Sequence, residues 1–148
     1  MTLTQPDTRV ADLLDIQRAT HVYARGLDRF DPQEAVSAFT DDAVWDATAV
    51  GLERFEGRAA ILGFFERDAA AIADQFHVIT NHVVDLDDDG TTATGTNYVF
   101  SEGHTKSGAS FKAIALNEDT YRRTPGGWRI ATRRISALTP PELEGFDA

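Results

Sequence analysis

The spacing of apolar residues changes once along this chain of 148 residues, and that change constrains the fold more than any other feature. Up to about residue 74, apolar residues recur at intervals of three and four, as on one side of an α-helix. From residue 76 onward they alternate with polar residues, which is typical of strands with one buried face. Helices followed by a meander of long antiparallel strands predict an α+β domain.

The helical half divides at two capping signals. The first helix is expected over residues 8–30, and the Asp31-Pro32 dipeptide then predicts an N-cap followed by proline in the first turn of a short helix that ends near Phe39. A brief strand over 43–48 and a third helix over 57–74 follow. The apolar side of the first helix is formed by Val10, Leu13, Leu14, Ile16, Tyr23, Ala24, Leu27 and Phe30.

The second half predicts four strands joined by tight turns. The strands are expected at 76–87, 91–104, 110–124 and 128–138, with DDDG and PGG as turn sequences. We expect one domain over residues 1–148, with its core at 9–138 and a loose tail at 139–148. A sheet that curls around the long first helix would leave a conical cavity between them.

Composition excludes several kinds of function. The formal net charge of −10 argues against nucleic acid and anionic membranes, which attract clustered Lys and Arg. The chain has no cysteine, so disulfides and thiolate chemistry are excluded. No run approaches the roughly 20 apolar residues that cross a bilayer, and the N-terminus has no apolar signal segment. The expected location is the cytoplasm.

Asp28, in YARGLDRFD (23–31), stands on the apolar side of the first helix, in line with Val10 and Ala24. A buried carboxylate is costly unless it is paired. Asp28 is therefore either a helix-end acid in solvent, a cap for a neighbouring helix, or half of a functional pair.

A histidine in the first long strand could be its partner. Strict alternation would place His77, Ile79, Asn81 and Val83 on one face of that strand, with His82 on the other. A carboxylate bonded to an imidazole fixes its tautomer and favours its action as a general base. The alternative is that His77 and Asn81 face solvent.

Metal and nucleotide sites are not indicated. DLDDDG (85–90) partly matches a calcium loop, but Thr96 stands where that loop needs Glu, and strands flank it rather than helices. The four histidines show no metal-ligand spacing, and there is no phosphate-binding glycine loop. We expect neither a metal nor a cofactor.

Five segments, in their order along the chain, resemble the SnoaL-like branch of the NTF2-like superfamily: YARGLDRFD, FTDDAVWD, FEGRAAILGFF, HVITN and GGWRIATRRI. The resemblance covers about residues 9–138. It implies a cone in which N-terminal helices pack on a strongly curved, mostly antiparallel sheet. A fold alone does not fix chemistry.

Within that superfamily the chain is most similar to the scytalone dehydratase and hexachlorocyclohexane dehydrochlorinase type. Asp28 and His77 match the Asp–His pair of both, and the resemblance implies that His77 removes a proton while Asp28 orients it. The dehydrochlorinase also has the HxxxN spacing that His77 and Asn81 keep. A basic residue on its last strand corresponds to Arg133, or to Arg134 if the alignment slips by one.

A ketosteroid isomerase site matches less well. Tyr23 stands where that enzyme has an oxyanion donor, but its catalytic Asp would fall at Ala47, and Asp46 is one residue away on the opposite strand face.

These residues predict a cofactor-independent lyase or isomerase that acts on a small hydrophobic, cyclic substrate. His77, Asp28 and Tyr23 would be catalytic; Asn81, Arg133, Trp45, Phe55 and Leu27 would bind substrate, with Phe64, Phe65 and Phe76 as further candidates for an apolar pocket wall. Two alternatives remain: a SnoaL-like cyclase, in which an acid protonates the substrate, and a non-catalytic domain that binds a small molecule or partner. The open sheet also predicts a homodimer or homotrimer.

Overall fold

A computed structural model describes residues 4–146. Its first half contains α1 (Thr4–Asp28), α2 (Pro32–Ser37), β1 (Phe39–Asp46), the 3₁₀ turn η1 (Thr48–Val50), β2 (Arg54–Glu56) and α3 (Arg58–Ala71). Its second half contains β3 (Ile72–Leu86), β4 (Thr92–Thr105), β5 (Ser110–Thr124), β6 (Gly127–Ala137) and β7 (Glu142–Glu144). The α+β fold predicted from the sequence is confirmed.

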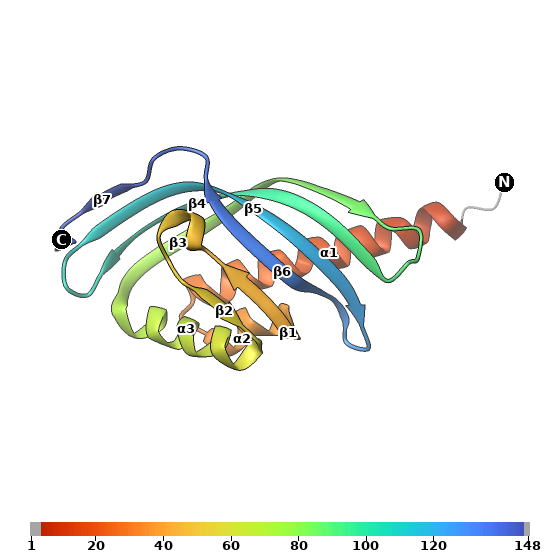
Figure 1. Ribbon diagram of the computed structural model, residues 1–148, viewed down its shortest axis with the longest axis horizontal. Helices are drawn as coiled ribbons and strands as arrows, with labels where there is room; N and C mark the ends of the chain where they lie inside the picture. Colours follow the sequence, from red (N-terminus) through yellow and green to blue (C-terminus); the bar gives the residue numbers. More distant parts are fainter. Residues whose placement is uncertain (1–3, 147–148) are drawn as a thin grey trace.

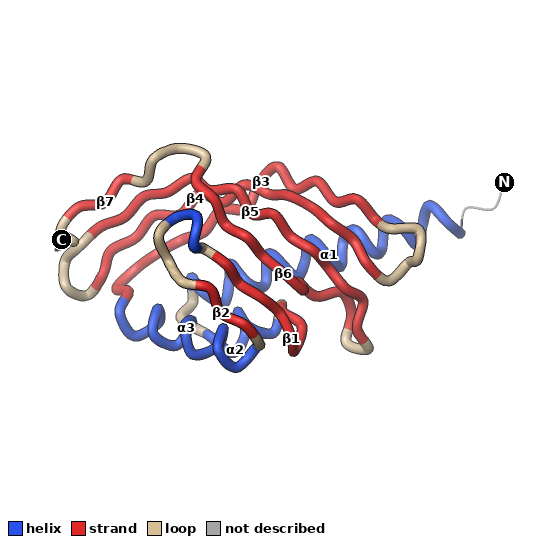
Figure 2. Tube along the Cα trace, in the orientation of Figure 1, coloured by secondary structure: helices blue, strands red, loops and turns tan. Residues whose placement is uncertain are grey.

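One curved sheet organises the described residues (Figures 1 and 2). The strand order is β2-β1-β6-β5-β4-β3, and β7 pairs with the first residues of β5. Neighbouring strands run antiparallel except for β1 and β6, which pair in parallel. The long meander β3 to β6 therefore forms most of the sheet, as the alternating sequence predicts.

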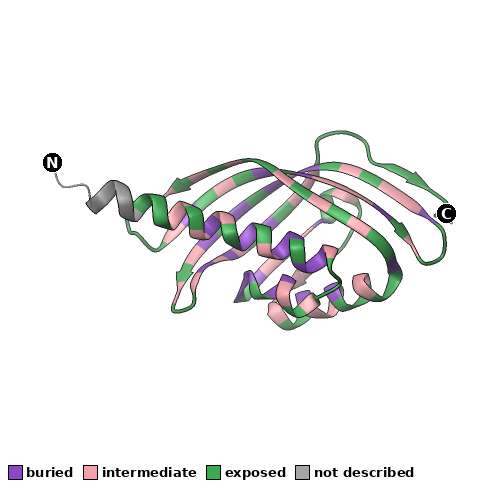
Figure 3. Ribbon diagram, turned by 180° about the vertical axis from the view of Figure 1, so that it is seen from behind, coloured by how far each residue is buried: buried purple, intermediate pink, exposed green. Residues whose placement is uncertain are grey.

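The helices α2 and α3 lie at the β1–β2 end of this sheet, beside the helix α1, which crosses one face of the sheet (Figures 1 and 3). Its buried side chains, among them Ile16, Tyr23 and Leu27, join one hydrophobic core with Phe65 of α3 and Trp128 of β6. Burial of this apolar surface is the main favourable term that holds the helix to the sheet.

The end of α1 is fixed by its own backbone. Phe30 has a φ of 56°, its N–H donates to the Leu27 carbonyl (3.1 Å), and the Asp31 N–H donates to the Gly26 carbonyl (2.8 Å). This is the Schellman arrangement. It turns the chain directly into α2, where Asp31 Oδ1 accepts the Glu34 N–H (3.1 Å) and Pro32 stands in the first turn. The predicted N-cap and proline are confirmed.

Several predicted boundaries were wrong. The first helix begins before residue 8 and ends at Asp28, and the short helix ends at Ser37 because Phe39 already belongs to β1. The third helix ends at Ala71, so Asp74 lies in β3. Neither η1 nor β2 was predicted, because elements of three residues carry almost no periodicity.

The segment that follows β6 is more ordered than the sequence predicts. The expected loose tail contains β7, which pairs with β5 through Ser110, Phe111 and Lys112. A three-residue strand of alternating acids and one leucine gives no pattern that distinguishes it from a polar tail. Residues 147 and 148 of the tail, like residues 1–3, lie outside the described residues.

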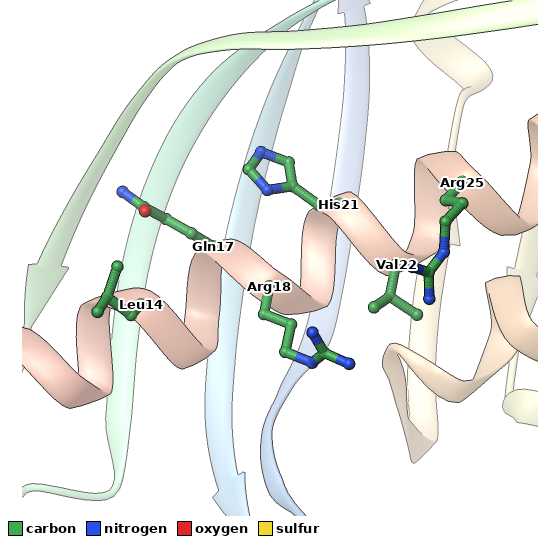
Figure 4. A pocket seen from close by; sticks show the side chains of 6 residues that line it. All are labelled: Leu14, Gln17, Arg18, His21, Val22 and Arg25. Atoms are coloured by element: carbon green, nitrogen blue, oxygen red, sulfur yellow. The ribbon is translucent and has the colours of Figure 1, made fainter.

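The apolar side of α1 is only partly covered. Val10 and Leu14 are more than half exposed, and Phe30 is also exposed. Leu14 lies on the same side of α1 as Arg18, His21 and Arg25 (Figure 4), and Phe30 lies in the turn after α1. No helix within residues 4–146 is both long and apolar enough to span a membrane.

Candidate active site

Asp28 and His77 are hydrogen-bonded to each other. His77 Nδ1 lies 2.7 Å from Asp28 Oδ1, and the His77 backbone N–H donates to Asp28 Oδ2 at 3.0 Å. Both oxygens of the carboxylate are therefore used by one residue of β3. The side chains of Asp28 and His77 keep 26% and 14% of their surface exposed, so the pair is partly desolvated but still reachable. Of the alternatives for Asp28, the pairing with His77 is the one that the structure contains.

The strand that carries His77 does not alternate strictly. β3 pairs with β4 through Thr80–Tyr98 and Val83–Thr96, so that Asn81 and His82 together face Asn97. Asn81 adopts a φ of 52° and is exposed. This is a β-bulge, and asparagine is one of the few residues that tolerates its left-handed position.

The bulge corrects two predictions. Asn81 and Val83 do not share a face with His77, and His82 does. His82 Nε2 lies 3.0 Å from the Tyr121 hydroxyl, on the face of the sheet that α1 covers. The extra residue of the bulge thus turns Asn81 away from the candidate site, and strict alternation does not predict it.

Tyr23 lies beside the pair, one and a half turns before Asp28. Its ring centroid is 6.5 Å from that of His77 and 5.7 Å from those of Phe39 and Phe65. Burial raises the pKa of the Tyr23 hydroxyl, while the Arg133 guanidinium and the Trp45 indole N–H partly lower it. The hydroxyl therefore stays protonated and can act as a hydrogen-bond donor.

Arg133, rather than Arg134, points into the protein. It is 1% exposed, whereas Arg134 is exposed on the other face of β6. Its Nε and Nη2 both donate to Asp119 at 2.8 Å, Nη2 also donates to Thr20 at 2.7 Å, and its guanidinium carbon lies 4.7 Å from the centre of the Tyr23 ring. Arg133 is thus a buried and paired charge.

Two buried donors lie next to the Tyr23 hydroxyl without a well-formed hydrogen bond. Nη1 of Arg133 and Nε1 of Trp45 have no partner of normal hydrogen-bond geometry among the described residues, although Trp45 lies near enough to Tyr23 to lower its pKa. Buried donors of this kind are rare in folded proteins. A substrate oxygen bound near Tyr23 would give them an acceptor.

Asp119 is the centre of a buried polar network. It accepts from Arg133, from the Tyr121 hydroxyl (2.8 Å) and from the Asn97 amide (3.1 Å), and the amide of Asn117 donates to Asn97 (2.9 Å). Burial alone would lower the pKa of Arg133, but the attraction and hydrogen bonds of Asp119 more than offset it and the pKa is raised.

The predicted apolar wall is formed in part. Trp45 and Phe55 are cross-strand neighbours on β1 and β2, and Phe64 of α3 packs against both, with ring centroids 4.7 Å and 4.8 Å away. Leu27 is buried in the core one residue before Asp28. Phe76 is not part of this wall, because it lies exposed on the outer sheet face against Phe100.

Sequence reasoning missed a second carboxylate, Asp68 of α3. Its Oδ2 accepts a hydrogen bond from Gln75 Nε2 (2.8 Å), and the same nitrogen donates to the Leu27 carbonyl (3.0 Å). The signal was present: Asp68 follows Ile61 and Phe65 at helical spacing, on the buried side of α3. Asp28 was found by that rule, and Asp68 could have been.

The isomerase arrangement is not formed. Ala47 is buried where the isomerase would need an acid, and Asp46 Oδ1 accepts the Thr48 N–H (3.0 Å) and hydroxyl (2.7 Å). The DDDG segment is the predicted hairpin turn, in which Asp89 Oδ1 accepts the N–H groups of Thr91 and Thr92. Residues 4–146 contain no cluster of three His, Asp or Glu side chains placed to hold a metal ion.

Four surface hollows lie away from the Asp28–His77 pair. The one in Figure 4 has a volume of about 390 Å³ and follows α1 past Leu14, Arg18, His21 and Arg25. A neighbouring hollow of about 320 Å³ shares Arg18 and Arg25. The other two lie near Trp128 and over β3 to β5. None of these four is lined by His77, so a conical cavity over the pair stays a prediction.

Comparison with known proteins gives the family. A model of the SnoaL-like domain matches residues 8–134, which is most of the chain. The chain belongs to the SnoaL-like family. Its structural neighbours include proteins named for scytalone dehydratase and dehydrochlorinase activity, and a protein described as NTF2-like that is 26% identical with a TM-score of 0.79, as the sequence resemblance implied. No match was found among curated proteins.

Solved structures similar to this SnoaL-like protein carry different activity names. A provisionally named aromatic ring hydroxylase from Novosphingobium aromaticivorans is 30% identical, with a TM-score of 0.86 over 90% of this chain and 94% of that one. A provisionally named scytalone dehydratase from the same species is 20% identical, with a TM-score of 0.85 over 97% and 94%. The type 3 hexachlorocyclohexane dehydrochlorinase of Novosphingobium barchaimii is 20% identical, with a TM-score of 0.79 over 95% and 96%.

Proposed function

We propose that this protein is a cofactor-independent lyase or isomerase that removes a proton next to an activating group of a small, hydrophobic, cyclic substrate. The observation that carries the proposal is the Asp28–His77 hydrogen bond. A carboxylate only accepts, so Nδ1 carries the proton and the lone pair of Nε2 is left to act as a base. Asp28 would also stabilise the imidazolium that forms.

The surroundings supply a place for the charge that develops on the substrate. Proton removal next to a carbonyl produces an enolate oxygen, which preorganised donors stabilise. Tyr23 would be that donor, supported by Arg133 Nη1 and Trp45 Nε1, two buried donors beside it that lack a partner of normal geometry among the described residues. Because Arg133 is already paired with Asp119, we assign it to holding Tyr23 and the oxyanion rather than to capturing a free anion.

The apolar side of the site would be formed by Trp45, Phe55 and Leu27. Rings at 4.7 to 6.0 Å from one another favour a flat, unsaturated or aromatic ligand over a flexible chain. The neighbours named for scytalone dehydratase and dehydrochlorinase activity are consistent with elimination. Dehydration or a related elimination is therefore the reaction we assign first.

The test is an elimination assay on cyclic β-hydroxy ketones, with wild type, His77→Gln and His104→Gln. His104 makes the matched control, because its Nδ1 is also 2.7 Å from a carboxylate, Asp74, but on the exposed surface. We expect turnover by wild type and His104→Gln, and a loss on the order of 10²- to 10⁴-fold in His77→Gln. Binding without turnover in all three proteins would favour the non-catalytic alternative. Ring closure of an open-chain precursor without any proton abstraction would favour the cyclase.

A further inference from the structure

The second carboxylate near the pair, Asp68, has no role in proton abstraction as described so far. An elimination that releases water needs two proton transfers: a base must take a proton from carbon, and an acid must give one to the departing hydroxyl oxygen. His77 supplies only the first. A dehydratase site therefore needs an acid that still holds its proton near neutral pH.

The amide of Gln75 places Asp68 beside the pair. Gln75 and His77 are alternate residues on the same face of β3, and Leu27 and Asp28 are consecutive in α1. Gln75 Nε2 bridges Asp68 Oδ2 and the Leu27 carbonyl at 2.8 Å and 3.0 Å. One side-chain amide thus ties α3 to the two segments that carry the base and its partner.

Burial of the Asp68 carboxyl favours its neutral form. Burial raises the pKa of Asp68, and the Asp28 carboxylate raises it further. The Gln75 hydrogen bond and the His77 imidazolium lower it, but the net direction is upward. Tyr23 of α1 also faces Asp68 closely enough for the Asp68 charge to raise the Tyr23 pKa.

We propose that Asp68 is the general acid of the site and protonates a hydroxyl leaving group, a role that rests on the proposed elimination. His77 Nε2 takes the proton next to the carbonyl, and the C–H electron pair becomes the new C=C bond. The C–O bond breaks with its electrons on oxygen, and the Asp68 proton completes a water molecule. The proton held by His77 then returns to Asp68, directly or through solvent, and no oxidant or reductant is needed.

The leaving group separates this role from a structural one. A chloride departs as an anion without a proton, whereas a hydroxyl needs one. We would therefore compare 3-hydroxycyclohexanone with 3-chlorocyclohexanone in wild type, Asp68→Asn, His77→Gln and the exposed control Asp74→Asn. The amide oxygen that Asp68→Asn introduces could still accept the Gln75 N–H, so the bridge to α1 is conserved in that variant.

We expect Asp68→Asn to lose on the order of 10²-fold or more in water elimination and to change chloride elimination by less than about threefold. His77→Gln should lose both activities and Asp74→Asn neither. Equal loss of both reactions in Asp68→Asn, or no loss of either, would overturn the role of Asp68 and leave His77 as the base. Absence of both reactions in wild type would instead contradict the proposed function, and the acid with it.

A second readout does not depend on turnover. Carboxyl ¹³C NMR, with Asp68 assigned through Asp68→Asn, should show Asp68 titrating well above the ordinary aspartate value of about 3.9. Titration at or below that value would overturn the proposal, because an acid that is fully ionised at neutral pH has no proton to give.

Discussion

Asp28 holds His77 at two points: Oδ1 lies 2.7 Å from the imidazole Nδ1, and Oδ2 accepts the backbone N–H at 3.0 Å. The second contact fixes the carboxylate relative to the strand, and the first fixes the ring relative to the carboxylate. The exposed pair Asp74–His104 has the same 2.7 Å side-chain distance and an entirely different environment. The exposed pair can therefore serve as a control for the effect of burial and of neighbouring residues on the chemistry of an Asp–His pair.

The ion pair between Asp119 and Arg133 should be essential for stability. Both side chains have no exposed surface, so Asp119→Asn would leave the guanidinium buried and uncompensated. We expect a loss of about 3–5 kcal/mol in the free energy of unfolding, measured by urea titration with Trp fluorescence. The exposed pair Asp42–Arg122 is the control, and Asp42→Asn should change stability little. Similar effects in both variants would contradict this account of the network.

His82 should make the protein less stable as the pH falls. Burial lowers the pKa of His82, and Arg133 and His21 lower it further against the raising effect of Asp119. The unfolded chain then binds the proton more readily than the folded one, so stability decreases as pH drops below about 6.5, until the folded-state pKa has been passed.

Replacing His82 isolates that effect. The variant His82→Gln can still meet the Tyr121 hydroxyl but does not titrate, so its urea midpoint should depend less on pH in this range. His104 serves as the opposite control, since Asp74 raises its pKa and its contribution is lost as pH rises. An unchanged pH dependence in His82→Gln would show that another group is responsible.

Gly26 is required by the packing of α1 on α2. A Cβ built on Gly26 would lie 2.3 Å from the backbone nitrogen of Ala35, which cannot move without displacing α2. We expect Gly26→Ala to destabilise by about 1–3 kcal/mol in thermal or urea unfolding. Gly63→Ala in α3 is the control, because its Cβ would meet only the flexible end of Arg67 at 3.5 Å. That variant should be neutral or stabilised by about 0.4–1 kcal/mol.

The outer face of the sheet predicts self-association. Phe76, Val78, Tyr98 and Ile114 lie exposed on the same face of β3, β4 and β5, and a second copy is the partner we propose for them. Light scattering should give an oligomer for wild type and a smaller species for Val78→Glu. Leu52→Glu, an exposed apolar residue off this face, should stay oligomeric. A monomeric wild type would contradict the proposal.

Much of the fold could be predicted because its signals are long. The helical spacing of α1 and the alternation along β3 to β6 extend over ten or more residues each, and Asp31-Pro32 specifies its cap locally. β2 and β7 could not be predicted, because three residues give no periodicity and their pairing depends on the neighbouring strand.

The candidate site was partly predictable for the same reason. Asp28 could be identified as an acid on the apolar side of a helix. That position does not depend on where the helix begins or ends, so the errors in the predicted helix ends did not affect it. Asn81 was misplaced because one extra residue in β3 reverses the alternation after it, and nothing in the sequence marks the bulge except an asparagine that tolerates positive φ. Arg133 rather than Arg134 is buried because the register of β5 with β6 shifts between Tyr121–Ile130 and Thr120–Thr132, and strict alternation from Trp128 and Ile130 does not anticipate that shift.

The most direct test of the central claim measures proton abstraction itself. In D₂O, NMR can follow exchange of the hydrogens next to the carbonyl of cyclohexanone, a reaction that needs a base but no leaving group. We predict that wild type, Asp74→Asn and His104→Gln accelerate this exchange equally, while Asp28→Asn and His77→Gln lose on the order of 10²-fold or more. Exchange that persists in His77→Gln, or that falls as far in His104→Gln, would contradict the assignment of His77 as the base.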